Sequence, residues 1–320
     1  MTSRKASTNN SVFARLLRVA LSGRGRFVTF GLVVVAMAAA AVVHYWPDLR
    51  AGILRNPDLW LAEDAVRITP LPPWIRTDVR GEVLRDGSLD GRVSILDPDL
   101  ARRLSEAFAL HPWVARVTRV TKRHPAGVTV DLEYRRPVCM VKVAGRLFPP
   151  NAEGARVPDG YYPIDVEGIL LPTADFSPVE TARYPRLVNV DSLPVGLPGT
   201  RWGDMRIQGA AAIAALLVDV WADWDLDRME LVKGAQPTSR DNAHEYRLLA
   251  ASGAPIRWGH PPGQETAGEV TAAEKLARLE ATQAEGLLDT ADGRAPIDLR
   301  YPDPSAARGE TADRRNSRDE

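Results

Sequence analysis

The feature of this sequence that most constrains its fold is an uncharged apolar stretch between Phe27 and Trp46. It reads FVTFGLVVVAMAAAAVVHYW, and its length matches the roughly 20 apolar residues that a helix needs to cross a bilayer core. Tyr45 and Trp46 close the stretch with rings suited to the headgroup layer, and His44 is near enough to that end to reach water. We therefore expect a single transmembrane helix over residues 27–46.

Basic residues lie mainly on one side of this stretch. Residues 47–62 carry two basic and two acidic side chains, whereas residues 1–26 carry no acid and six basic residues: Arg4, Lys5, Arg15, Arg18, Arg24 and Arg26. Because Lys/Arg-rich flanks stay cytoplasmic, we expect residues 1–26 to be a cytoplasmic tail, in which residues 11–21 form either an amphipathic helix on the inner leaflet or a solvated segment. The alternative is a signal peptide cleaved near Ala36-Met37-Ala38, although the apolar run exceeds the usual length of such peptides.

Composition limits what the remaining chain can be. With 320 residues and 45% hydrophobic content, the part beyond the expected span is long enough for one or two domains with their own cores. Without the cytoplasmic tail the chain has 35 basic and 41 acidic residues, which disfavours nucleic acid as a partner. Cys139 is the only cysteine, so an intrachain disulfide and a cysteine zinc site are excluded, and we expect Cys139 to be a small core residue.

The first segments beyond the membrane predict a small α/β unit. Residues 64–69 and 90–96 alternate as short strands do, and prolines interrupt the chain at 70–73. Asp97-Pro98 predicts the start of a helix that stops at His111-Pro112. Residues 114–121 and 128–134 then alternate on either side of a turn, which predicts a hairpin, and Trp113 at its start should be buried.

These residues resemble a known family. The order of helix, Pro112-Trp113-Val114, basic strand, His124-Pro125, alternating strand and Glu133-Tyr134-Arg135-Arg136-Pro137-Val138 is similar to the POTRA domain of the FtsQ/DivIB family of bacterial cell-division proteins. The prolines at 70–73 depart from that pattern, which usually has a glycine or asparagine turn there.

The resemblance continues along the chain. The segments of residues 161–172, 184–188, 205–221, 229–232, 245–249, 255–259, 270–280 and 297–301 follow the order of strands and helices in the family's second, β-rich domain. We therefore expect an α+β protein in which one transmembrane helix is followed by a linker (47–63), a POTRA-like domain (64–143) and a mixed β-sheet domain with flanking helices (144–303). Prolines 302 and 304 shorten the last strand, and residues 304–320 are expected to be a disordered tail.

No set of residues predicts catalysis. The five histidines are scattered, and neither a nucleophile elbow nor a phosphate-binding loop is present. His244-Glu245 is interpreted as a solvated strand end. The acids at positions 223, 225 and 227 have the opening spacing of a calcium loop, but Arg228 and Gly234 stand where that loop needs glycine and glutamate, so a solvated helix end is the better interpretation. We expect no enzyme activity, no metal, no cofactor and no small-molecule substrate.

The resemblance implies a scaffold in the cytoplasmic (inner) membrane at the division site. It implies that the β domain binds division proteins of the FtsB and FtsL type outside the cytoplasm, and that the POTRA-like domain contacts other components of the division machinery. A membrane-anchored POTRA module for protein export or outer-membrane assembly is the alternative, and an anchored envelope hydrolase is a third hypothesis.

The expected partner-binding edge is the last strand. Alternation places Ile297, Leu299 and Tyr301 on one face and Asp298 and Arg300 on the other. A last strand is often an edge strand, and an edge can add a strand from a partner. We assign partner binding to these residues and to the strand that resembles the family's glycine-ended strand, namely Ile256, Arg257 and Trp258. Tyr301 is either the main contact or a cap on the core.

Overall fold

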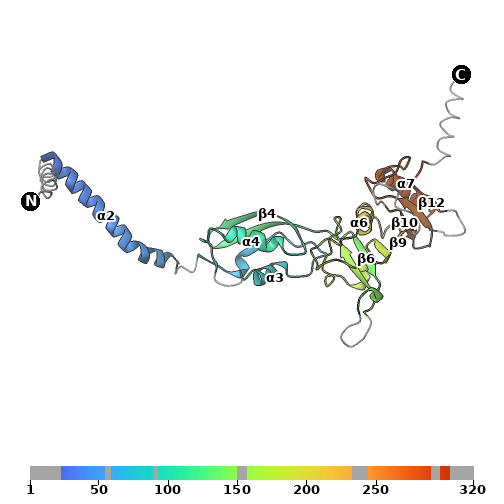
Figure 1. Cartoon of the computed structure of the whole chain (residues 1–320), viewed down its shortest axis with the longest axis horizontal. Helices are drawn as coiled ribbons and strands as arrows, with labels where there is room; N and C mark the ends of the chain where they lie inside the picture. The colour runs from blue at the N-terminus through green and yellow to red at the C-terminus, as the bar shows by residue number, and fades with distance from the viewer. Residues whose placement is uncertain are drawn as a thin grey trace, which may run out of the picture.

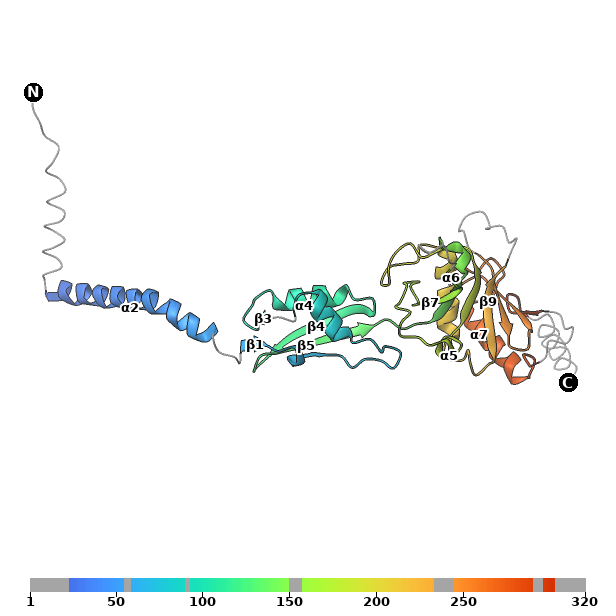
Figure 2. The same cartoon turned by 90° about the horizontal axis from the view of Figure 1, so that it is seen from below.

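The computed structural model describes residues 23–54, 59–89, 93–149, 157–232, 244–289 and 296–302. It is a mixed α+β fold with several sheets, in which a long helix is followed by two domains along one axis (Figures 1 and 2). The α+β class expected from the sequence is therefore confirmed. The tail of residues 1–22, including the expected helix at 11–21, and the C-terminal residues 303–320 lie outside the described residues.

The N-terminal helix, α2, spans Gly23–Leu54 and stands apart from both domains in both views (Figures 1 and 2). It continues past Pro47, where we expected a linker. A proline inside a helix removes one hydrogen bond and can kink the helix without ending it. Within the described part of the chain, no helix combines the length and the apolar character needed to cross a membrane. The expected span of residues 27–46 includes Val28 and Thr29, whose side chains lie outside the described residues.

The first domain, which we expected to be POTRA-like, is built on a three-stranded sheet in the order β2-β5-β4. The expected hairpin is confirmed as β4 (Val114–Arg123) and β5 (Gly127–Tyr134), and β2 (Val66–Ile68) pairs with β5 in parallel. A separate two-stranded sheet joins β1 (Trp60–Leu61) to β3 (Val93–Ser94), next to the short turn η2 (Glu63–Ala65). Trp60 and Leu61 therefore belong to this domain and not to a linker.

Two helices complete this domain. Helix α3 (Val79–Asp86) begins after Asp78, whose carboxylate accepts a hydrogen bond from Gly81 N. Helix α4 (Leu100–Ala109) buries Leu100, Leu104 and Phe108. It begins later than the expected start at Asp97-Pro98, because Asp97 caps a turn instead and accepts a hydrogen bond from Asp99 N. The buried side chains of α3, α4 and the sheet form one core.

The second domain contains a seven-stranded sheet in the order β12-β11-β10-β9-β8-β6-β7. Its strands are β6 (Cys139–Val143), β7 (Gly160–Ile164), β8 (Arg186–Val190), β9 (Leu226–Leu231), β10 (Tyr246–Ala250), β11 (Pro255–Gly259) and β12 (Ile297–Asp298). Its helices are α5 (Pro178–Thr181), α6 (Met205–Leu217) and α7 (Ala272–Ala284), and a short turn η3 (Gly145–Leu147) follows β6. Side chains from α6, α7 and one face of the sheet form the core, which includes Cys139.

The boundary between the domains differs from the one we expected at residues 143 and 144. Strand β6, which the sequence grouped with the POTRA-like domain, pairs with β7 and β8 of the large sheet. Val138 and Cys139 are buried in the second core, whereas Leu132 is buried in the first. The division therefore falls between Leu132 and Val138, because the apolar pattern of β6 indicates a buried strand without indicating which sheet it joins.

A buried carboxylate joins the domains. Asp175 of the second domain accepts hydrogen bonds from Arg76 N and Thr77 N, both at 2.8 Å, and from the Trp113 indole at 2.8 Å. Leu171 of the second domain also lies in the core of the first. Trp113 is fully buried, as the sequence predicted, and its polar atom is satisfied by the neighbouring domain. Since all of these donors belong to the first domain, Asp175 fixes the two domains against each other.

Candidate functional site

The expected docking edge lies at one end of the seven-stranded sheet. Strand β12 is the last strand in the sheet order and pairs in parallel with β11, with Ile297 opposite Ile256. One side of β12 therefore has no partner strand among the described residues. The strand is shorter than expected, since Asp298 Oδ1 accepts a hydrogen bond from Arg300 N at 3.0 Å and turns the chain.

Helix α7 holds the backbone that follows this strand. The Arg278 guanidinium donates to the carbonyl of Asp298 at 3.2 Å, to that of Leu299 at 3.0 Å and to that of Tyr301. Sequence reasoning missed Arg278, because a side chain 20 residues before the strand gives no local signal of this contact. Arg278 thus fixes the path of the chain from Asp298 to Tyr301.

Arg300 and Tyr301 present a charged and aromatic surface. Arg300 forms ion pairs with Asp298 at 2.8 Å and with Glu245 at 3.4 Å. The hydrogen bonds that Arg300 donates to the Asp298 carboxylate raise the pKa of Arg300 and lower the pKa of Asp298. The guanidinium carbon of Arg300 lies 5.2 Å from the centre of the Tyr301 ring, which is within the range of a cation–π contact. Tyr301 remains 48% exposed.

A groove runs beside this edge. It has a volume of about 530 Å³ and is bordered by α7 and by the last strand. Its lining residues are Arg278, Ala281, Thr282, Glu285, Leu287, Ile297, Asp298, Leu299, Tyr301 and Pro302. Aliphatic, aromatic and charged groups are therefore all within reach of a chain that lies along β12.

A buried ionic cluster of Lys275, Glu269 and His260 lies next to this edge. Lys275 Nζ lies 2.6 Å from Glu269 Oε1, and the other carboxylate oxygen of Glu269 lies 2.7 Å from Nδ1 of His260. Burial acts to raise the pKa of Glu269, but hydrogen bonds from Lys275, Thr266 and His260 outweigh it and lower this pKa to about 2. The next residue, Val270, donates its N–H to the Arg300 carbonyl at 2.8 Å. The cluster therefore holds the loop that contains Glu269 and Val270 against Arg300, at the end of the docking edge.

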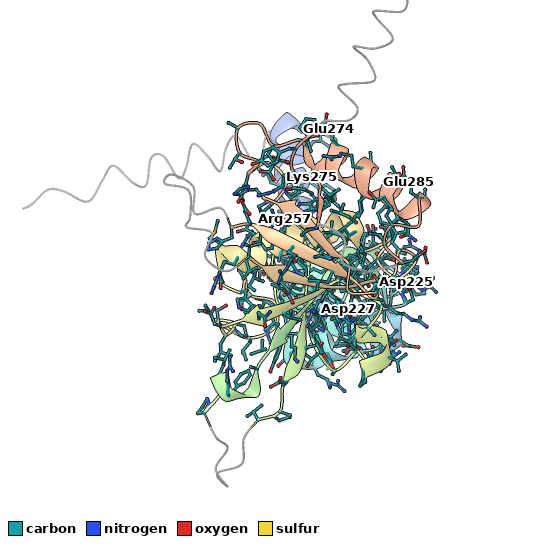
Figure 3. All side chains as sticks on the ribbon, turned by 90° about the vertical axis from the view of Figure 1, so that its right-hand side faces the viewer. Asp225, Asp227, Arg257, Glu274, Lys275 and Glu285 are labelled. Atoms are coloured by element: carbon teal, nitrogen blue, oxygen red, sulfur yellow. The ribbon has the colours of Figure 1, made fainter. Side chains whose placement is uncertain are left out.

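Figure 3 looks onto the end of the second domain that carries this edge. Glu274 and Glu285 mark the two ends of α7, and Lys275 lies on the helix above the strand that carries Arg257. Lys275 Nζ is also 5.6 Å from the centre of the Trp258 ring, which ties the helix to β11.

The structure separates the expected partner-binding residues into two groups. Ile256, Trp258 and Leu299 are buried in the core, so their side chains hold the sheet and are not presented to a partner. They are buried because alternate side chains of β11 and of residues 297–299 point into the core that also contains side chains of α6 and α7. Arg257, whose side chain is 53% exposed, lies 4.0 Å from Asp298, and both reach the surface. Ile297 is partly buried.

The other singled-out residues have structural surroundings. Asp227 pairs with Arg186 and Arg228, and Glu245 pairs with Arg300. Burial raises the pKa of the Cys139 thiol to about 12. Within the described ranges, no three histidine, cysteine, aspartate or glutamate side chains lie close enough together to hold a metal ion.

No protein-family model matches this sequence, and no curated protein matches it.

Proposed function

We propose that this protein is a non-enzymatic scaffold of bacterial cell division that is anchored in the cytoplasmic membrane by one helix. The observation that carries the proposal is the open edge at β12, where a groove, an arginine and an exposed tyrosine lie together at the end of a seven-stranded sheet. The ordered resemblance to the FtsQ/DivIB family, from Pro112-Trp113-Val114 to Ile297–Tyr301, supports the cell-division role.

The apolar side chains of α2 support a membrane anchor. Phe27 is 81% exposed and Val43 is 76% exposed, although both are large and apolar. A run of such side chains that contacts neither domain needs an apolar environment, because leaving them in water costs about 25 cal/mol per Å² of apolar surface. We propose that residues 27–46 cross the membrane, with residues 1–26 in the cytoplasm and both domains outside it.

The topology of the first domain supports its comparison with POTRA domains. A strand, two helices and a hairpin follow one another, and the first strand lies beside the last strand of the hairpin. We propose that this domain contacts other components of the division machinery.

The geometry of β12 supports strand addition as the docking mode. A partner strand would pair with the open side of β12, and main-chain hydrogen bonds would supply affinity that depends little on sequence. Arg278 occupies the carbonyls of Asp298 and Leu299, but a carbonyl oxygen can accept a second hydrogen bond. Tyr301 and the groove would then select the partner, which we propose to be a division protein of the FtsB or FtsL type.

Co-purification tests the proposal. The full chain should be recovered from native membranes in mild detergent, beside Tyr301→Ala and, as a control, Val195→Ala, whose side chain is exposed elsewhere on the second domain. We expect bitopic division proteins with the unchanged chain and the control, and a loss of at least tenfold with Tyr301→Ala. Recovery of export or outer-membrane assembly components instead would favour the POTRA export module. Recovery of neither class would refute the scaffold.

A further inference from the structure

A second groove lies at the junction of the two domains, away from the docking edge. Pro73 and Trp74 of the first domain form one side, and Phe176, Tyr184 and Val218 of the second domain form the other. Its volume is about 350 Å³, and its polar lining comes from Arg136, Asp175, Glu180 and Arg183. Sites between domains are common places for recognition because two surfaces converge there.

The aromatic floor of this groove is rigid. Trp74 donates its indole N–H to the Arg135 carbonyl at 3.1 Å, which fixes the ring across the domain boundary. Phe176 meets Tyr184 edge to face, with ring centres 5.9 Å apart, and its other neighbour is the buried Trp113 at 6.1 Å. All three floor rings are only partly buried, so each keeps a face or an edge available. A ligand would not have to order them on binding.

The prolines before Trp74 are part of this rigidity. The run of residues 70–73 contains three prolines, which fix the backbone and leave few conformations to lose. The next amides, of Arg76 and Thr77, are held by Asp175. Pro73, the last residue of the segment that departs from the POTRA pattern, therefore forms one wall of the groove together with Trp74.

The formal charges of the groove lining balance, with Arg136 and Arg183 against Asp175 and Glu180, but both acids already have partners. The Asp175 carboxylate is buried and already accepts hydrogen bonds from the first domain. Glu180 pairs with Arg76 and caps α5 through Ser177. Arg136 pairs with Asp219 at the surface. Among the described residues Arg183 has no ion-pair partner, so an acidic group on a ligand would complement it.

We propose that this interdomain groove binds an extended segment of another protein in which proline or aliphatic residues lie next to an acidic residue. Aromatic grooves bind proline-containing segments well because such segments are already extended and lose little conformational entropy. The acidic residue lies against Arg183, while the apolar residues pack on Trp74, Phe176 and Tyr184. This surface is independent of β12 and serves a different partner segment.

Labelled peptides test the inference with the full chain in detergent. The probes are four fluorescein-labelled nonapeptides that combine a Pro-Leu-Pro or a Ser-Gly-Ser centre with flanks of Asp and Glu or of Lys and Arg. Binding is measured by anisotropy. We expect saturable binding of the acidic Pro-Leu-Pro peptide, at least tenfold weaker binding of the other three, and a loss of at least tenfold in Arg183→Glu.

Charge reversal makes the test specific. Arg183 is exposed, so Arg183→Glu leaves the fold intact, and it should bind the basic Pro-Leu-Pro peptide better than the unchanged chain does. Arg85→Glu, on the exposed side of α3, is the matched control and should bind as the unchanged chain does. The inference would be overturned if Arg183→Glu bound the acidic Pro-Leu-Pro peptide as well as the unchanged chain does. It would also be overturned if the unchanged chain bound the acidic Ser-Gly-Ser peptide as well as the acidic Pro-Leu-Pro peptide, or showed no saturable binding of the latter.

Discussion

Removing the Asp175 carboxylate should uncouple the two domains and destabilise the first. In Asp175→Ala four donors lose their acceptor: the amides of Arg76 and Thr77, the Thr77 hydroxyl and the fully buried indole of Trp113. Leaving a buried donor unsatisfied costs about 1–3 kcal/mol. The indole should be near the upper value and the three partly accessible donors of Arg76 and Thr77 near the lower one, which gives a loss of roughly 5–6 kcal/mol.

The loss should be concentrated in the first domain. Such a change is a large fraction of the stability of a small domain, typically about 5–15 kcal/mol. Hydrogen exchange of the full chain in detergent, read by mass spectrometry, reports the two domains separately. The free energy of opening measured at the amides of β2, β4 and β5 should fall by about this amount. The same free energy should change little at the amides of β8 to β11.

A matched control separates this effect from the loss of any acid near the junction. Asp219 also lies near the boundary and pairs with Arg136, but its side chain is 70% exposed. Asp219→Ala should change protection by less than about 1 kcal/mol, as expected for a surface ion pair. Equal protection in Asp175→Ala and Asp219→Ala would refute the role of Asp175 as the link between the domains.

Further predictions concern the core, the buried ionic cluster, the single cysteine and the topology. Trp113→Ala should lower the stability of the first domain by about 3–5 kcal/mol, as the loss of a buried tryptophan does, and thermal unfolding with an unchanged midpoint would contradict its burial. The Glu269 pKa of about 2 lies below its ordinary value of 4.5, so its contribution, roughly 3 kcal/mol, should be present above about pH 4.5 and lost as pH falls towards 2. Glu269→Gln should therefore reduce the free energy of unfolding at pH 7, and this free energy, measured with urea, should fall less steeply below pH 4.5 than in the unchanged chain. An unchanged pH dependence below pH 4.5 would contradict this assignment. Cys139, whose pKa is raised to about 12, should react with a thiol reagent only after unfolding. A reporter active only outside the cytoplasm should work when fused after Tyr301 and fail when fused at Ser11, whereas a mature chain that lacks residues 1–38 would indicate signal-peptide cleavage.

Local patterns predicted the elements of the fold better than their assembly. The alternation on both sides of the turn at 124–127 predicted β4 and β5, because one face of that hairpin is buried and the other is solvated. The residues of β6 were grouped with the first domain, because a run of apolar residues does not encode which sheet it joins. The domain boundary was therefore placed too late in the chain.

The candidate site was predicted in part for the same reason. The last strand followed from the proline after it and from its position in the chain, whereas the sequence left open whether Tyr301 is a contact or a cap on the core, and the structure leaves it 48% exposed. The burial of Trp258 depends on α7 covering β11, which is a long-range contact. Asp175 and Arg278 act on residues far away in sequence, so no motif or period around either residue indicates its role.

Photocrosslinking at position 301 tests whether the docking edge contacts a division protein. A photoreactive phenylalanine analogue in place of Tyr301, in the full chain in native membranes, keeps an aromatic ring at the exposed end of β12. The same analogue at Leu110, exposed at the end of α4, is the control. We expect a covalent adduct between position 301 and a bitopic division protein of the FtsB or FtsL type, and no such adduct from position 110. No division protein crosslinked at 301, or the same adduct formed equally at 110, would contradict this expectation.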